Sequence, residues 1–269
     1  MGIISTLRAK LSDPRLEGVD VDSTELVDVN LSILVEKPMI KEVFKEFYDL
    51  CIGLNKKLLN GKGLEIEVGA GASFFKQVYP HIISTDIKAS SHHDRILDIQ
   101  NMNLESQSVR GFYAINCFHH LPEPRKFFSE LKRTLVPGGG IVLIEPYYGW
   151  AAHLLYAYIH KEEHFNSKQK AWESIRDPRY VMSDANQALS YLIFIRDRKQ
   201  FEEEFPELEI VYQATINNYL RYLLSGGVSF RQLVPNKMIR MLKWVEYLLK
   251  PFERFIALHY VIVLRRKTN

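Results

Sequence analysis

The stretch Leu64-Glu-Ile-Glu-Val-Gly-Ala-Gly-Ala-Ser73 decides the fold. Residues 64–68 are predicted to form a short strand, which runs directly into the two glycines at positions 69 and 71. A short helix is predicted over 73–79, because Pro80 would end it there. A strand, a glycine turn and a helix in this order predict the first βα unit of a parallel sheet.

The segments that follow continue the alternation of short strands and helices. Further strands are predicted over 81–85, 95–97, 112–116, 141–144, 208–212 and 258–264, and helices over 38–59, 124–135 and 198–205. Pro137-Gly-Gly-Gly140 is expected to stop the helix that precedes the strand at 141. Such alternation is typical of a parallel sheet covered on both faces. The predicted fold class is α/β, a Rossmann-like, seven-stranded, mostly parallel sheet sandwiched by helices.

The regions outside this alternation are predicted to be helical additions. Residues 1–60 are expected to form an N-terminal helical cap, and 61–269 the domain that contains the sheet. Two helical insertions are placed at 146–196 and 217–256, after the fifth and sixth strands.

The composition excludes several classes of protein. The 269 residues are 46% hydrophobic and 25% charged, which excludes a disordered chain. The net charge of +3 is too balanced for a protein that grips nucleic acid over its whole surface. Two cysteines, Cys51 and Cys117, give no disulfide framework and favour a reducing compartment. The start of the sequence does not resemble a secretory signal, and no apolar run approaches the roughly 18 residues that span a bilayer. A soluble, cytoplasmic protein is expected.

Three acidic residues stand at the ends of successive predicted strands, namely Glu67, Asp86 and Asp98. The carboxyl ends of parallel strands form the ligand-binding edge of an open sheet. Asp86 is placed to accept hydrogen bonds from a ribose diol, and Asp98 from the exocyclic amine of adenine. This pattern predicts a ligand that contains adenosine.

Two features argue against a pyrophosphate cofactor such as NAD. Phe74 stands where a dinucleotide-binding loop has its third glycine, and Glu67 would repel phosphate. S-adenosylmethionine has no phosphate and carries an ammonium group that suits Glu67. A nucleotide-cofactor oxidoreductase is therefore the weaker alternative.

The stretch from 64 to 146 resembles class I S-adenosylmethionine-dependent methyltransferases, most of all the bacterial small-molecule, lipid or sugar branch. The matching pieces are Glu67-Val-Gly-Ala-Gly71, the strand that ends in Asp86, Asp98-Ile99, Asn116-Cys-Phe-His-His-Leu-Pro122, Leu135-Val-Pro-Gly-Gly-Gly140 and Ile141-Val-Leu-Ile-Glu-Pro146. They cover about a third of the chain. One departure is Ser73, where the family usually has a third glycine.

The resemblance implies a role for each residue of the cofactor site. Glu67 would bind the methionine ammonium, Gly69 and Gly71 would line the methionyl moiety, Asp86 would hold the ribose, Ile87 would pack on adenine, Asp98 and the Ile99 amide would read the adenine edge, and Asn116 would offer its carbonyl to the methionine end. S-adenosylhomocysteine would be the product. The alternative for each Asp is a helix cap or a turn.

Residues after the fourth and fifth strands are candidates for the acceptor site. His119 or His120 is a candidate general base for an oxygen acceptor, although His120 could equally pack while His119 organises the turn. Further substrate candidates are Glu145, Tyr147, Tyr148, Trp150, His160, Arg196, Arg198 and Arg231. His160 and His164 are four residues apart, which permits metal ligation, but a solvated charged helix face is favoured and no metal is predicted. For the Arg-bearing segments the alternative is plain packing.

The segment 237–256 is basic and amphipathic and contains Trp244 and Tyr247. Such a helix could lie peripherally on an anionic membrane, or it could face the core or a homodimer partner. By the same resemblance, the absence of an Asn-Pro-Pro-Tyr-type stretch after the fourth strand argues against a nucleobase amino-methylating enzyme, and no nucleic-acid partner is expected. We expect methyl transfer to a small-molecule, sugar or lipid acceptor, at oxygen. A non-catalytic protein that binds S-adenosylmethionine or a membrane surface is the second alternative.

Overall fold

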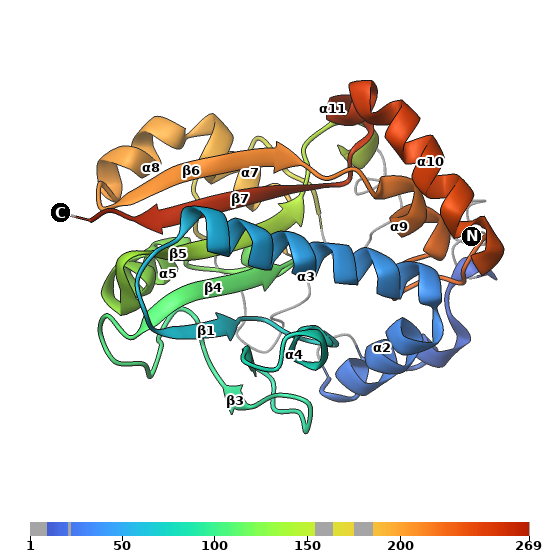
Figure 1. The fold of residues 1–269 in the computed structure, drawn as a ribbon, viewed down its shortest axis with the longest axis horizontal. Coiled ribbons are helices and arrows are strands. Elements are labelled where there is room, and N and C mark those ends of the chain that lie inside the picture. The colour runs from blue at the N-terminus through green and yellow to red at the C-terminus, as the bar shows by residue number, and fades with distance from the viewer. Residues whose placement is uncertain (1–9, 21–22, 154–163, 175–184, 269) are drawn as a thin grey trace.

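The computed structural model of the chain describes residues 10–20, 23–153, 164–174 and 185–268. One sheet with the strand order β3-β2-β1-β4-β5-β7-β6 runs through the molecule (Figure 1). Its strands are β1 (Leu64–Glu67), β2 (Ile83–Asp86), β3 (Arg95–Ile96), β4 (Val109–Ile115), β5 (Leu135–Pro146), β6 (Leu208–Thr215) and β7 (His259–Arg266). All pairs from β3 to β5 are parallel, and β7 is antiparallel to both β5 and β6. The predicted fold class is confirmed.

Helices cover both faces of the sheet. On one face lie α3 (Pro38–Leu58) and α4 (Phe75–Val78), and α3 crosses the strands in the foreground of Figure 1. On the other face lie α5 (Pro124–Thr134), α7 (Leu189–Tyr191), the π-helix η3 (Leu192–Arg196) and α8 (Arg198–Glu204). Each layer is fixed by its own buried cluster.

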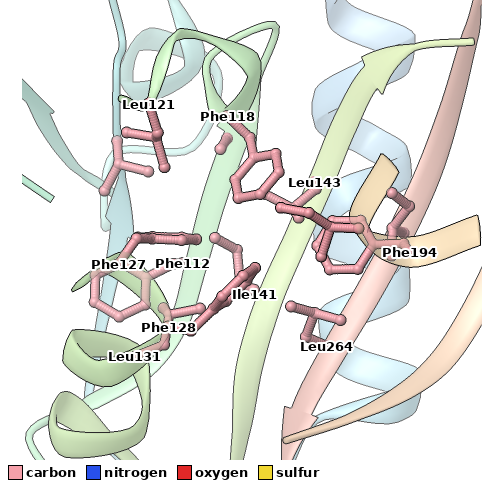
Figure 2. Packing of buried hydrophobic residues seen from close by; sticks show 14 of the residues in the cluster. Phe112, Phe118, Leu121, Phe127, Phe128, Leu131, Ile141, Leu143, Phe194 and Leu264 are labelled. Carbon is pink, nitrogen blue, oxygen red and sulfur yellow. The ribbon is translucent and has the colours of Figure 1, made fainter. Parts of the chain in front are cut away.

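The larger cluster joins the sheet to the second helical layer. Phe112, Ile141, Leu143 and Leu264 from the sheet pack against Phe127, Phe128 and Leu131 of α5 and Phe194 of η3 (Figure 2). Aromatic rings dominate the contact: the ring centroids of Phe128 and Phe201 are 5.0 Å apart. On the opposite face Phe47, Tyr48 and Cys51 of α3 are completely buried. Burial of each such side chain contributes about 1.5–3 kcal/mol to the driving force for folding.

The prediction that Pro137–Gly140 lies between a helix and a strand is wrong. Helix α5 ends at Thr134 and β5 begins at once, at Leu135, so the three glycines lie inside the strand. A Cβ on Gly140 would stand 2.1 Å from the Leu264 carbonyl oxygen, and one on Gly139 would stand 2.7 Å from the Arg110 carbonyl oxygen. Gly139 and Gly140 are needed because the neighbouring strands approach closely, whereas Gly138 has a φ of +80°, a conformation that favours glycine.

The remaining helices gather at the end of the sheet toward which β1, β4 and β5 point (Figure 1). They are α2 (Glu25–Glu36), α9 (Tyr219–Ser225), η4 (Asn236–Met238), α10 (Ile239–Leu249), η5 (Lys250–Phe252) and α11 (Glu253–Ile256). Together they build a helical wall at the carboxyl edge, where the ligand is expected.

A buried ion network holds α9 and α10 onto α3. The Arg221 Nε–H donates to Glu246 Oε2 (2.7 Å), and its two terminal nitrogens donate to the two oxygens of Glu46 (2.7 and 2.8 Å). Arg221 and Glu246 are only 3% and 1% exposed. Burial raises the pKa of Glu246, while Arg221 lowers it. The charges compensate one another only while all partners are present.

We expect the Arg221→Ala variant to lose about 3–5 kcal/mol of unfolding free energy, since the buried Glu246 would keep its charge without a partner. Urea denaturation followed by circular dichroism measures this. The matched control is Arg198→Ala, whose exposed pair with Glu202 should contribute about 0.5 kcal/mol or less. Equal losses in the two variants would contradict this account of the network.

Candidate functional site

A pocket opens at the carboxyl edge of the sheet. Its lining includes seven of the eight predicted cofactor residues and one of the two candidate bases, namely Gly69, Gly71, Asp86, Ile87, Asp98, Ile99, Asn116 and His120. They come from the ends of β1, β2 and β4 and from the segment after β3, up to 51 positions apart in the sequence. The parallel sheet brings these strand ends to one place, as the pattern of acidic residues predicts.

The glycine turn after β1 has a steric origin. Gly69 has a φ of +63°, and a Cβ there would stand 2.1 Å from the Cys117 Sγ. Gly71 has a φ of +50°, and a Cβ there would meet nothing within 4 Å. Gly69 is therefore required by the protein's own packing, whereas the space at Gly71 faces the pocket.

Asp86 serves the turn as well as the pocket. Its carboxylate accepts hydrogen bonds from the N–H groups of Gly71 (2.8 Å) and Lys88 (2.8 Å), one on each oxygen. A ring nitrogen of His93 lies 2.8 Å from the Gly71 carbonyl oxygen. Asp86 therefore has the turn-stabilising role that was the alternative to ligand binding. Each oxygen still has further lone pairs to offer a ligand.

Glu67 lies just beneath this turn and is 3% exposed. Burial raises the pKa of its carboxyl to about 8, although side-chain hydrogen bonds with Ser73 and Ser84 lower it. Its Oε2 has no hydrogen-bond partner among the described residues. Glu67 does not line the pocket in its present outline. An unsatisfied buried carboxylate oxygen is costly, and such groups concentrate at binding sites.

Ser73, the departure from the family pattern, has a local function. Its Oγ accepts the Phe75 N–H (3.0 Å) at the start of α4 and shares a hydrogen bond with the Tyr48 hydroxyl (2.9 Å). The serine therefore connects the glycine turn to α3.

The residues beyond β2 and β3 form the other wall of the pocket. Ile87 is half-exposed at 46% and Ile99 is buried. Asp98 accepts the Gln100 N–H (2.8 Å), which is an Asx turn. An exposed apolar side chain opposite a carboxylate is the arrangement that an adenine base would need, with one flat face and one polar edge.

Asn116 ends β4 in a conformation that is unusual for its residue type. Its φ is +51°, and its N–H donates to the Ile144 carbonyl oxygen (2.8 Å). Its Oδ1 is buried without a partner within the described part of the chain. A left-handed, non-glycine residue costs on the order of 1 kcal/mol and tends to mark functional sites.

Glu145 is not a substrate residue, and this prediction is corrected. Its side chain is completely buried. One oxygen accepts the N–H groups of Cys117 (3.0 Å) and Phe118 (2.9 Å), and the other accepts the N–H and Nδ1–H of His119 (3.2 and 2.7 Å). Its acceptor capacity is thus used by the turn η2 (Phe118–His120), so none remains for a ligand.

The two candidate bases separate in the structure. His119 is held by Glu145 and does not line the pocket, whereas His120 does. Their ring centroids are 4.3 Å apart. Of the pair, only His120 is placed to meet a ligand.

Aromatic and polar side chains follow the edge from the pocket toward β7. The ring centroids of Tyr147 and Tyr148 are 4.5 Å apart, and those of Tyr147 and Tyr260 are 5.6 Å apart. Burial raises the pKa of Tyr147 to about 12. Trp150 is largely exposed. Several buried polar atoms here have no partner within the described residues, namely the Ser190 Oγ, both amide atoms of Asn218, the Tyr219 hydroxyl and the Tyr260 hydroxyl.

The three arginine candidates do not reach this edge, and these predictions are also corrected. Arg196 donates to Asp197 and to the Gln169 carbonyl oxygen. Arg198 pairs with Glu202 on α8, at the opposite end of the sheet (Figure 1). Arg231 binds the backbone of Leu11 and Ser12. His160 lies outside the described residues. Within the described ranges, no three His, Cys, Asp or Glu side chains form a possible metal site.

The sequence analysis missed the third wall of the pocket. Leu26, Val27 and Asn30 of α2 line it, as do Lys88, Gln100 and Leu121. The residues after β2 and β3 could have been found as neighbours of Asp86 and Asp98. The contribution of α2 could not, because it is a contact between segments about 40 residues apart.

The comparison with protein families decides the identity of this region. Residues 66–143 match a family described as a methyltransferase domain. This part of the chain is therefore similar to a methyltransferase domain. The predictions of a methyltransferase and of S-adenosylmethionine as its cofactor are confirmed for this part of the chain. A comparison with curated proteins gives no match.

Two solved structures illustrate the likeness. Phosphoethanolamine N-methyltransferase 2 from Haemonchus contortus, in complex with S-adenosyl-L-methionine, has 11% identity and a TM-score of 0.43, over 82% of this chain and 53% of that one. This chain therefore spans about half the length of that protein. Geranyl diphosphate C-methyltransferase from Streptomyces coelicolor has 12% identity and a TM-score of 0.47, over 85% of this chain and 82% of that one.

We expect the Glu67→Gln variant to be more stable than the parent protein near pH 8, by at least about 1 kcal/mol. The ordinary carboxyl pKa of 4.5 rises to about 8 in the folded state, so unfolding releases a proton and the parent loses stability as pH rises between these values. Glutamine carries no such proton.

Urea denaturation of the ligand-free protein at pH 5 and pH 8 tests this. The exposed Glu203→Gln change is the control and should have no effect at either pH. A Glu67→Gln variant that loses stability at pH 8 would contradict the assignment of a buried, poorly compensated carboxylate.

Proposed function

We propose that this protein transfers the methyl group of S-adenosylmethionine to an oxygen atom of a small-molecule, sugar or lipid acceptor. The observation that carries the proposal is the pocket itself: it gathers strand-end residues of the methyltransferase domain together with one histidine, His120. The bacterial small-molecule, lipid or sugar branch remains our assignment within the family.

The residues present fit the cofactor. The unpartnered oxygen of Glu67 and the open space at Gly71 suit an amino acid moiety that carries an ammonium group. Asp86 would hold the ribose, Ile87 would cover the adenine, and Asp98 with the Ile99 amide would bind its edge. Asn116 would offer its carbonyl to the methionine end.

The first alternative was an oxidoreductase that uses a nucleotide cofactor. The helix after the glycine turn, α4, has only four residues and begins at Phe75, and Glu67 lies beneath the turn. A pyrophosphate needs a free helix N-terminus and no carboxylate nearby, so this site is unfavourable for it. The second alternative is a non-catalytic protein that only binds S-adenosylmethionine or a membrane surface. Such a protein would not need a histidine in the pocket, so the position of His120 favours an enzyme.

The chain's own residues supply positioning and a base. When bound, S-adenosylmethionine supplies a methyl group that is attached to a positively charged sulfonium. The acceptor atom attacks the methyl carbon, and the electrons of the carbon–sulfur bond remain on sulfur. His120 would accept the proton of the acceptor hydroxyl. His119, fixed by Glu145, packs on the ring of His120 and is a positioning residue. The apolar lining from Leu97 and Leu121 excludes water.

A second set of buried polar atoms, on residues that do not line the pocket, would suit an uncharged acceptor with hydroxyl groups. They are hydroxyls and an amide, on Ser190, Asn218, Tyr219 and Tyr260, and none of these side chains carries a charge. Buried polar atoms of this kind gain most from a ligand that donates and accepts hydrogen bonds. The arginine candidates, which would have favoured an anionic acceptor, all lie elsewhere.

Calorimetric titration tests the cofactor assignment. S-adenosylhomocysteine should bind and NADH should not. The Glu67→Gln variant should bind S-adenosylhomocysteine about 10-fold or more weakly, because a charge-assisted hydrogen bond to the ammonium is lost. Glu203→Gln is the control. Tighter binding of NADH than of S-adenosylhomocysteine would overturn the assignment.

Transfer of a radiolabelled methyl group from S-adenosylmethionine into extracted lipids and small molecules tests the reaction. The His120→Gln variant should lower the rate by about 10²–10⁴-fold, with little change in the affinity for S-adenosylhomocysteine. The ascending limb of the pH–rate profile near the ordinary imidazole pKa should disappear. The exposed His81→Gln change is the control. A His120→Gln variant that keeps the parental rate at every pH would show that positioning alone suffices.

A further inference from the structure

The helical wall carries an exposed aromatic face over α10, η5 and α11. This face consists of Met241, Trp244, Tyr247, Leu248, Phe252 and Phe255. Trp244 is 63% exposed and Tyr247 is 71% exposed. The other side of α10 is fully used inside the protein, since Leu242 is buried and Glu246 belongs to the Arg221 network. The face is therefore not the core-facing side of the helix.

An exposed concentration of large apolar side chains points to a function in binding. Scattered surface leucines need no explanation, but six exposed large apolar side chains within 15 residues are an unusual local concentration. The aromatic face is rich in Trp, Tyr and Phe, the residues that gather at the boundary between lipid and water. This composition favours contact with a lipid surface over exposure to water alone.

Cationic side chains surround the aromatic face. Lys237, Arg240, Lys250 and Arg254 are exposed and make no ion pair with any described residue. Lys243 is different, because it pairs with Glu42 and Glu46 of α3. Of the two acidic residues in this segment, Glu246 is buried and only Glu253 is partly exposed. The face thus presents an excess of positive charge.

We infer that the aromatic face docks on the surface of an anionic lipid bilayer. A helix with aromatic side chains on one exposed side and lysines and arginines around it lies in the plane of the interface, with its apolar side in the headgroup region. Each cation near such a surface contributes about 1 kcal/mol, a factor of about five in affinity. No helix within the described residues is long and apolar enough to cross a bilayer, so the contact is peripheral.

A second copy of the chain is the less suitable occupant. A two-fold dimer would place the same face against itself and bring four cations of one protomer against four of the other. A bilayer with phosphatidylglycerol or a similar lipid offers the opposite charge. The complementarity of charge therefore selects the membrane.

Docking would also set the orientation of the site. The chain after α11 returns to the sheet at Leu258, whose carbonyl accepts the Tyr147 N–H (2.7 Å). Helices α10 and α11 lie at the end of the sheet toward which β1 and β4 point (Figure 1), and the residues that line the pocket follow the same strand ends. Docking does not rest on the proposed methyl transfer, since vesicle binding requires neither cofactor nor acceptor.

The experiment is co-sedimentation of the full chain with vesicles of phosphatidylcholine, alone or mixed with phosphatidylglycerol. The parent protein should bind the mixed vesicles, bind phosphatidylcholine weakly, and release as salt is raised. Replacing Arg240 and Lys250 together by Gln should weaken binding to mixed vesicles about 30-fold, two factors of about five. Trp244→Ala and Tyr247→Ala should weaken binding to both kinds of vesicle.

Two control variants keep the result interpretable. Ile96→Ala removes an equally exposed apolar side chain from β3, and Lys199→Gln removes a cation from α8. Both should bind vesicles like the parent, and all variants should keep the parental circular dichroism spectrum because the altered residues are exposed.

Three outcomes would overturn the inference. They are absence of binding to mixed vesicles, equal loss in the control variants, and a dimer by light scattering that Trp244→Ala dissociates in a protein without vesicle affinity. The last would assign the aromatic face to a second copy of the chain.

Discussion

The buried carboxylate of Glu145 organises the edge of the sheet on which the site is built. It lies on β5, yet its four hydrogen bonds all go to the turn after β4. An anion that accepts the first N–H groups of a short helix compensates for its own burial with directed, charge-assisted bonds. The turn is thereby fixed between Asn116, in its left-handed conformation, and His120, which faces the pocket. Removal of this one carboxylate would leave three buried N–H groups without acceptors at the centre of the site.

Glu67, at the end of β1, is a second buried glutamate, but the protein provides it with fewer hydrogen-bond donors than Glu145 has. Its oxygens are not saturated by the protein, and burial raises its pKa to about 8. The fold therefore tolerates an unfavourable group that a cationic ligand would stabilise. Two buried glutamates on nearby strands thus have different roles, and the difference is the number of N–H donors that surround each one.

Much of the sheet could be predicted, because most strands contain a short apolar run, and β1, β2, β3 and β5 end at or within two residues of a glycine, an aspartate or a proline. The acidic strand ends of β1 and β2 could be predicted for the same reason, since parallel strands bring consecutive ends together. Glu145 stands in the same kind of position, and the sequence therefore predicts a substrate residue there. The sequence does not show that it faces a turn with three unpaired N–H groups. Burial separates the two cases, and burial depends on the tertiary structure.

Segments far apart in the chain explain the other differences. The wall from α2 and the partners of the three arginines are long-range contacts, which spacing along the sequence cannot indicate. Gly138–Gly140 carry the composition of a turn, but the close approach of β4 selects Gly139 and that of β7 selects Gly140. The amphipathic pattern of 237–256 was compatible with a core-facing helix or a surface helix. The structure distinguishes the two cases. Glu246 is buried in the ion network of Arg221, so its side of the helix faces the protein, and Trp244 and Tyr247 are exposed. A surface helix usually turns its apolar side to the core and its charged side to water. Here an ion network holds the inner side of the helix, and its aromatic residues are available to bind an external surface.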